Sequence, residues 1–156
     1  MIALDPLEGW WYRHLGQIQM VQGHYKEALE NFTTAKRLVA EAGGLLGQSD
    51  PAIELSVAYG MLANDRFPEA IAAAQLAITQ RAPDAGRVGE MDWLTLIAAE
   101  SEDGQDAQAR ADLQKFLATP RTLRTIADIQ RAFTFSHLAT LRQLLDGLRR
   151  AEMPAE

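Results

Sequence analysis

Residues 12–35, with the sequence YRHLGQIQMVQGHYKEALENFTTA, contain two helical patterns separated by a short break at Gly23 and His24. Apolar residues recur at helical spacing on both sides of this break. Glycine commonly ends a helix because it adopts the left-handed backbone conformation at little cost. Gly16 and Ala28 have small side chains that allow the two helices to approach closely. Because a short turn forces its helices to run antiparallel, the segment predicts a tightly packed helical hairpin.

The same hairpin pattern returns twice along the chain. Ala28, Ala70 and Ala109 occupy matching positions that are 42 and 39 residues apart. The matching turn positions are Gly23, Asp65 and Gly104, and the matching positions inside the first helix are Gly16, Ala58 and Ile97. An internal period of this size is typical of helical repeat proteins, in which neighbouring units stack and share a continuous core.

The pattern resembles the tetratricopeptide repeat, a helix–turn–helix unit of about 34 residues. The residues that carry the resemblance are Tyr12, Leu15, Gly16, Gly23, Tyr25, Ala28, Leu29, Phe32 and Ala35 in the first unit, Ala58, Phe67, Ala70, Ile71, Ala74 and Ala77 in the second, and Trp93, Gly104, Ala109 and Leu113 in the third. The third unit departs from the signature, since Ile97 and Phe116 stand where small residues are usual. The resemblance implies an all-α fold: a right-handed superhelical solenoid of three helical hairpins plus two C-terminal capping helices. The array would cover residues 1–120, with units at about 7–42, 51–83 and 90–120, and the caps would cover 121–156.

Helix ends are predicted from capping residues and breakers. Asp-Pro pairs at residues 5–6 and 50–51 are start signals, with aspartate as the cap and proline at the first helical position. We expect helices over residues 6–22, 25–42, 51–63, 67–82, 90–102, 106–118, 125–133 and 136–151, with Ser136 capping the last one. Residues 84–89 are expected to form a loop.

The two ends of the chain resemble parts of longer proteins. The last residues, LLDGLRRAEMP (144–154), resemble the end of the tetratricopeptide region of bacterial adenylate/guanylate cyclase-like or winged-helix signalling proteins. The opening IALDP (2–6) resembles a run that closes a unit. The resemblance implies the C-terminal part of a longer array; the alternative is that Met1 is the natural start and the opening is a cap. Leu138, Leu141, Leu145 and Leu148 share one face of the closing helix, as a cap requires.

Composition excludes several classes of protein. The net charge of −6 argues against nucleic acid, because phosphate binding needs a basic face. The chain has no cysteine, which fits a reducing compartment, and no apolar run of the roughly 18 to 20 residues that a membrane span needs. A cytoplasmic protein that binds neither nucleic acid nor membrane is the expectation.

Residues with catalytic or metal-binding spacing are not found. His14, His24 and His137 do not pair at a metal-ligand spacing, and no phosphate-loop, nucleophile-elbow or zinc-protease motif is present. The acidic residues Glu100, Glu102, Asp103 and Asp106 do not have the alternating oxygen-ligand pattern that Ca²⁺ requires. We therefore expect a protein that is not an enzyme and that has no cofactor, catalytic residue or metal site.

The resemblance implies that the first helices of the units line a concave groove that takes an extended peptide or a helix. The groove residues carried over to this sequence are Trp10, Arg13, His14, Gln17, Met20, Leu55, Tyr59, Leu62, Leu94 and Thr95. Their apolar and aromatic character favours a hydrophobic or amphipathic helix as the guest. The alternative is that the repeats have no external ligand and serve homo-oligomerisation, for example as a homodimer of a larger parent protein.

Three consecutive aromatic residues at the start of the first helix bear on this choice. Trp10, Trp11 and Tyr12 point about 100° apart on a helix, so they cannot all face one core. We expect Tyr12 to take the packing position and the two tryptophans to face a neighbour, a ligand or solvent. An isolated chain would then expose an apolar patch near its N-terminal end, and such patches drive self-association.

Overall fold

The computed structural model describes residues 6–43, 50–82, 85–132 and 138–156, with the backbone alone described at residues 6, 7 and 138–141. In these ranges the chain forms eight helices and no strand, which confirms the predicted all-α class. The helices are α1 (Pro6–Gln22), α2 (Tyr25–Ala42), α3 (Pro51–Ala63), α4 (Phe67–Gln80), α5 (Gly86–Glu102), α6 (Asp106–Ala118), α7 (Ile126–Ala132) and α8 (Leu138–Arg150).

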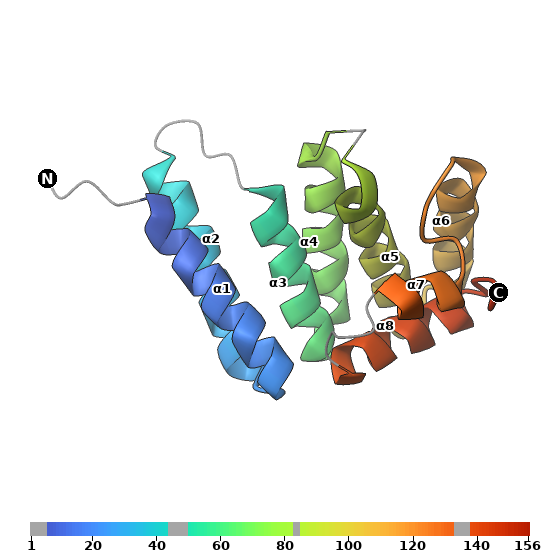
Figure 1. Ribbon diagram of the computed structural model, residues 1–156, viewed down its shortest axis with the longest axis horizontal. Coiled ribbons are helices and arrows are strands. Elements are labelled where there is room, and N and C mark those ends of the chain that lie inside the picture. The colour runs from blue at the N-terminus through green and yellow to red at the C-terminus, as the bar shows by residue number, and fades with distance from the viewer. Residues whose placement is uncertain (1–5, 44–49, 83–84, 133–137) are drawn as a thin grey trace, which may run out of the picture.

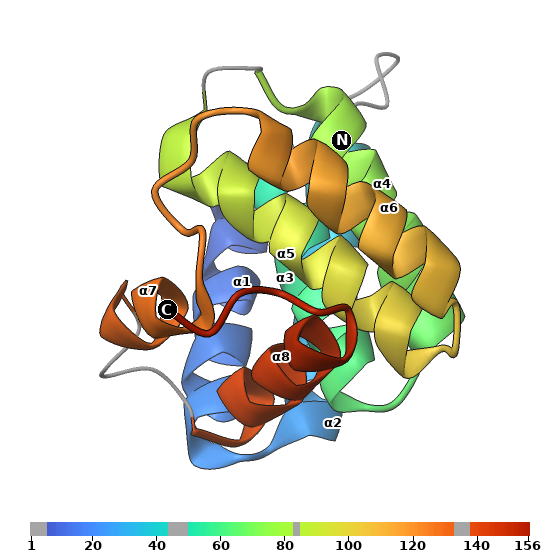
Figure 2. The same ribbon diagram turned by 90° about the vertical axis from the view of Figure 1, so that its right-hand side faces the viewer.

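The first six helices form three antiparallel hairpins that lie side by side: α1 with α2, α3 with α4, and α5 with α6 (Figure 1). Successive hairpins contact one another through α2 and α3, and then through α4 and α5. The last helix, α8, does not continue this order. It turns back, lies across α5 and reaches α3 (Figures 1 and 2).

The hairpin turns have the predicted backbone conformation. Gly23 and Gly104 have φ angles of 79° and 80°, in the left-handed region that glycine adopts most readily. The second turn uses Asp65, with a φ of 57°, instead of glycine. Asn64 next to it donates to the backbone oxygens of Gly60 and Tyr25 at 2.7 and 2.8 Å. These bonds tie the second hairpin to the first.

Small side chains allow close helix contacts, as the sequence predicts. A Cβ atom added to Gly16 would lie 2.6 Å from the ring of Phe32 on α2 and 3.0 Å from the backbone oxygen of Ala28. Ala28, Ala58 and Ala70 are fully buried. A larger residue at these positions would push the paired helices apart.

Two hydrophobic cores meet at α5. The N-terminal core is formed by residues of α1 to α5, and it includes Phe32, Ile53 and Leu96. The C-terminal core is formed by α5 to α8 and the last residues, and it includes Leu94 and Leu148. Because α5 contributes to both cores, the hairpins and the C-terminal helices are packed as one continuous structure.

Several predicted helix boundaries differ from the structure, including the end of α4, which lies at Gln80 instead of residue 82. α5 begins at Gly86, whereas residues 84–89 were expected to form a loop. Gly89 lies inside the helix because one helical glycine costs only about 1 kcal/mol relative to alanine, which the remaining helical hydrogen bonds offset. α7 (Ile126–Ala132) begins one residue later than expected, and α8 (Leu138–Arg150) ends one residue earlier; the expected end of α7 and start of α8 lie outside the described residues. The predicted caps Asp5 and Ser136 lie outside the described residues, whereas Asp50 does cap α3, accepting from the backbone N–H of Ala52 at 2.7 Å.

The segment after α6 is fixed to α5 by one buried carboxylate. Glu90 accepts hydrogen bonds from the backbone N–H groups of Thr122 and Leu123 at 2.9 and 2.8 Å, and from the Thr122 hydroxyl at 3.1 Å. Farther on, the backbone N–H groups of Ile126 and Ala127 donate to the carbonyls of Pro154 and Ala155. The start of α7 is thereby held by the end of the chain.

Replacing Glu90 with alanine is expected to lower the free energy of unfolding by about 2 kcal/mol, because two backbone donors near the core lose their acceptor. Urea unfolding followed by circular dichroism measures this loss. The control is Glu69→Ala, which removes an exposed ion pair with Arg66 and should lower the free energy of unfolding far less. Equal losses in the two variants would contradict the anchoring role of Glu90.

Candidate partner-binding face

The predicted groove residues separate into two groups. Six reach the surface at least in part: Trp10, Arg13, His14, Gln17, Leu55 and Tyr59. Four are buried: Met20, Leu62, Leu94 and Thr95. The structure therefore brings only part of the predicted set to a surface that a partner can reach.

The four buried residues have packing roles that explain their position. Met20 and Leu62 belong to the N-terminal core, and Leu94 belongs to the C-terminal core. The Thr95 hydroxyl donates to the backbone oxygen of Met91 at 2.7 Å, within the same helix. A partner cannot contact these side chains unless the cores open, so a groove lined by all ten predicted residues does not exist in the folded chain.

The predicted groove lies on the face formed by α1, α3 and α5. α8 covers the part of this face that α5 and the C-terminal end of α3 form. Leu144, Leu145 and Leu148 of α8 are buried in the C-terminal core, and Leu55 and Tyr59 of α3 pack against that core. At the far end of α3, Gln143 donates to the carboxylate of Asp65 at 2.9 Å. Burial raises the pKa of the Tyr59 hydroxyl to about 12, although a hydrogen bond with Thr95 works in the opposite direction. The chain's own C-terminal helix thus occupies a large share of the surface predicted to bind a guest.

One sequence signal points to this placement of α8. Gly147 lies in the middle of the helix, where glycine is unfavourable. A Cβ atom there would lie 2.8 Å from the backbone oxygen of Ala98 and 2.9 Å from its Cα atom. The glycine is therefore required by direct backbone contact between α8 and α5.

The open part of the face lies between α1 and the first turns of α3. The guanidinium of Arg13 is stacked over the ring of Trp10, with 5.2 Å between its central carbon and the ring centroid. Its Nε donates to the Ser56 hydroxyl at 3.1 Å and more weakly to the Ala52 carbonyl at 3.4 Å. Among the described residues, the terminal nitrogens of Arg13 have no hydrogen-bond acceptor. We call this group, with Gln17 one turn farther along α1, the Arg13 site.

The surroundings of Arg13 disfavour its positive charge on balance, so a further anion would stabilise the guanidinium. Burial lowers the pKa of Arg13, the nearby carboxylate of Asp50 raises it, and the cation of Arg81 lowers it further. Half-buried arginine with free donors is well suited to bind a carboxylate or a carbonyl oxygen. The Arg13 site can therefore bind a polar group beside an aromatic surface.

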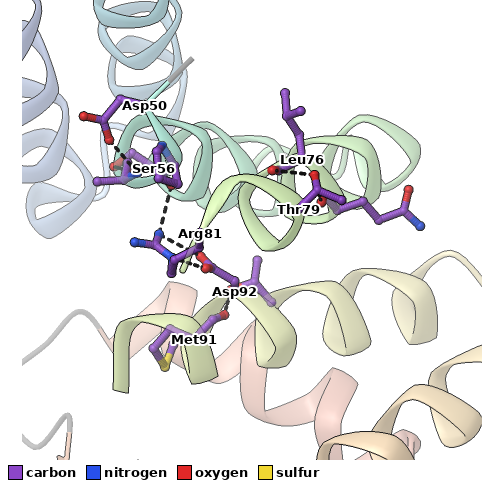
Figure 3. A network of polar contacts seen from close by, with 11 residues as sticks. Asp50, Ser56, Leu76, Thr79, Arg81, Met91 and Asp92 are labelled. Carbon is purple, nitrogen blue, oxygen red and sulfur yellow. Dashed lines mark hydrogen bonds and ion pairs between the residues drawn. The ribbon is translucent and has the colours of Figure 1, made fainter. Parts of the chain in front are cut away.

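Arg81 itself is fully engaged and fixes the position of α3 relative to α5. It forms a buried ion pair with Asp92, and its terminal nitrogen donates to the Pro51 carbonyl at 3.0 Å. Figure 3 shows Arg81 between the start of α3, where Asp50 and Ser56 lie, and Asp92 on α5. This pair holds the N-terminal end of α3 in place, and with it the Ser56 hydroxyl that contacts Arg13.

The predicted orientation of the α1 aromatic residues is wrong for Tyr12 and agrees with the structure for Trp11, which faces solvent. Trp10 is half-buried at the Arg13 site, and Trp11 is 72% exposed. Tyr12, expected to take the packing position, is 36% exposed. The positions that face α2 are instead taken by Gly9 and Gly16, which are buried against it.

The described ranges contain no cluster of potential metal ligands. No three His, Asp or Glu side chains converge there as a metal site would require. The acidic cluster considered above is dispersed: Glu102 pairs with Arg150 at 3.6 Å, and Asp103 accepts from Gln105. An open depression of about 550 Å³ between α2 and the α3–α4 turn is lined by Lys26, Leu29, Glu30, Thr33, Thr34, Asn64 and Arg66. None of the helices in the described ranges has the length and apolar content needed to cross a bilayer.

Comparisons with models of protein families, with curated proteins and with solved structures found no match for this chain. The function is therefore inferred from the geometry of the described residues and from the repeat pattern of the sequence.

Proposed function

We propose that this chain is a non-catalytic protein–protein interaction module that binds a peptide or a helix at the Arg13 site. The half-buried Arg13 guanidinium carries the proposal, because it is held by Trp10 and Ser56 while its terminal nitrogens are unused by the described residues. The site lies at the first turns of α3, whereas α8 contacts the opposite end of that helix at Asp65. A guest can therefore bind there without displacing α8.

The guest that fits is a short peptide or an amphipathic helix with apolar side chains and at least one carboxylate. Its apolar residues would pack on Trp10, and its carboxylate would accept from Arg13. Aromatic and arginine side chains that are partly desolvated commonly carry most of the energy of an interface. The absence of lysine and asparagine at matching positions in successive units argues against a clamp for a chain-terminal carboxylate.

The family and the cellular setting of the chain are inferred from the sequence pattern. We place the three hairpins among tetratricopeptide-type arrays, with a right-handed solenoid arrangement, because the turn and small-residue positions repeat in register. The resemblance of the closing residues supports a role as the C-terminal scaffold or regulatory part of a bacterial signalling protein. The absence of cysteine supports a cytoplasmic location.

Photo-crosslinking in cells tests the binding site. A photoreactive amino acid at Gln17, next to the Arg13 site, is expected to give adducts with a second protein, and the same probe at Thr33 on α2 is not. Arg13→Ala should reduce the yield at residue 17 at least about tenfold, since about 1.4 kcal/mol of lost binding energy has this effect. Circular dichroism checks that the variant is folded.

The same experiment can overturn the proposal. Equal adduct yields at residues 17 and 33, or yields at 17 that do not change in Arg13→Ala, would show that the Arg13 site does not bind the partner. Adducts with the mass of two copies of this chain are counted separately, because they report self-association.

A further inference from the structure

α1 has an exposed apolar stripe that no described helix covers. The stripe consists of Trp11, Leu15 and Ile18, which are 72%, 46% and 53% exposed and lie on one face at helical spacing; Tyr12 and Val21 flank it. The only formally charged residue between Gly9 and Gln22 is Arg13, and its side chain is turned toward α3. This surface is separate from the Arg13 site.

The residues at the matching repeat positions of α3 and α5 are buried, in contrast to the stripe. In α3 the matching residues are Ile53, Val57 and Gly60, and all three are buried. A Cβ atom on Gly60 would lie 3.0 and 3.1 Å from side-chain atoms of Phe32 and Leu29 on α2, the second helix of the hairpin before it. The matching residues of α5, which are Asp92, Leu96 and Ala99, are buried as well. The stripe therefore occupies the surface that receives a neighbouring helix in both later hairpins.

The opposite end of the molecule does not offer a matching helix. A second copy that stacked head to tail would place its α6 on the stripe. At the position where α2 and α4 have Leu29 and Ile71, α6 has Arg110, which pairs with Glu152 at 3.2 Å. Head-to-tail stacking would bury this ion pair against apolar side chains, which is unfavourable. Of these two arrangements of two copies, the one that pairs the stripe with itself avoids this cost.

We propose that two copies of this chain associate through their α1 helices, which pack antiparallel about a two-fold axis near Leu15. In this arrangement Leu15 meets the same residue of the second copy, and Trp11 of each copy lies opposite Ile18 of the other. The stripe itself contains no formally charged residue, and Glu8, exposed one turn before Trp11, lies at the end of the contact, so its centre desolvates no charge. A two-fold contact of this kind is self-limiting and gives a dimer.

The size of the stripe sets the expected strength of the dimer. The three side chains of the stripe and the two that flank it present roughly 500 Å² per copy, or about 1,000 Å² for a pair, which is near the lower limit for specific interfaces. We therefore expect a dissociation constant in the micromolar range.

Light scattering and sedimentation equilibrium test the dimer with purified chain at about 10 to 100 μM. The natural chain is expected to show the mass of two copies at the upper concentration, and Leu15→Lys the mass of one, with its dissociation constant raised at least tenfold. The matched control is Val88→Lys, which changes an exposed apolar residue at the start of α5 and should leave the dimer intact. Arg13→Ala should also leave it intact, so that failure of this proposal and failure of the Arg13 site are distinguished.

Disulfide trapping tests the geometry, because the natural chain contains no cysteine. Leu15→Cys is expected to form a disulfide with itself under mild oxidation. Trp11→Cys and Ile18→Cys should form one only when the two variants are mixed, since a disulfide requires Cα atoms within about 7 Å. Disulfides between two copies of Trp11→Cys would overturn the antiparallel arrangement. A single-chain mass for the natural protein at every concentration would overturn the dimer. The partner that covers the stripe would then be a helix of another protein.

Discussion

Replacing Gly147 with leucine is expected to lower the free energy of unfolding by about 3 kcal/mol or more, the upper range for overpacking a core. The added Cβ would lie 2.8 and 2.9 Å from the backbone oxygen and Cα of Ala98. Backbone atoms of a helix cannot move aside as a flexible side chain can, so α8 must shift away from α5. Leu144 and Leu148, which α8 buries in the C-terminal core, would then lose their packing.

The control for this variant is Gly89→Ala on α5. The nearest atoms to an added Cβ at Gly89 are 3.4 and 3.6 Å away, an ordinary contact distance. Because alanine favours a helix more than glycine, this change should stabilise the protein by up to about 1 kcal/mol. Urea unfolding followed by circular dichroism measures both variants. Gly147→Leu with the stability of the natural chain would show that α8 does not lie against Ala98.

Replacing Glu100 with glutamine is expected to stabilise the protein at alkaline pH and to have little effect at acidic pH. Glu100 is 1% exposed, and its Oε2 atom has no hydrogen-bond partner among the described residues. Burial, followed by the nearby carboxylate of Asp112, raises the pKa of Glu100 from 4.5 to about 7. Asp112 is itself bound by Lys115 at 2.7 Å and by Gln108 at 2.9 Å.

The sign of the effect follows from proton linkage. Between pH 4.5 and about 7, the folded chain keeps the Glu100 proton that the unfolded chain has released. The stability associated with this proton is fully present below pH 4.5 and is lost as the pH rises through about 7. Glutamine resembles the protonated carboxyl group at every pH. The free energy of unfolding of the variant should therefore be higher than that of the natural chain by up to about 3 kcal/mol above pH 8. Below pH 4.5 the two free energies should be almost equal.

Urea unfolding at a series of pH values measures this difference. Glu30→Gln is the control, because Glu30 is exposed on α2 and its replacement should change the free energy of unfolding little. If the difference in free energy of unfolding between Glu100→Gln and the natural chain stays constant from pH 4.5 to pH 8.5, the buried position of this carboxyl group is contradicted.

The sequence predicted the hairpins well because the signals that end helices are local. Gly23 and Gly104 lie at the turns, and Asp50 caps α3, as expected. These features depend on backbone conformation and on hydrogen bonds within a few residues. The start of α5 was misplaced because Gly89 was interpreted as a breaker, although it lies inside a helix where its neighbours leave room for it.

The position of α8 could not be predicted because it depends on contacts between residues far apart in the sequence. The leucine spacing of residues 138–150 indicated an amphipathic helix, but it did not indicate which surface the helix covers. That surface was assigned to a guest, and Leu94 was assigned to its lining, whereas Leu94 is buried in the core that α8 completes. Trp10 and Arg13, which were both assigned to the groove lining, lie together on α1.

Paramagnetic relaxation enhancement with one spin label most directly tests the central claim, which is that α8 lies against α5 and the C-terminal end of α3. The label is attached through Gln143→Cys, since the natural chain has no cysteine. The account predicts strong broadening of the amide signals near Asp65, whose carboxylate accepts from Gln143, and weak broadening in the first turns of α3, where the Arg13 site lies. Broadening confined to α8 itself would contradict the claim, because α8 would then not cover the face formed by α3 and α5.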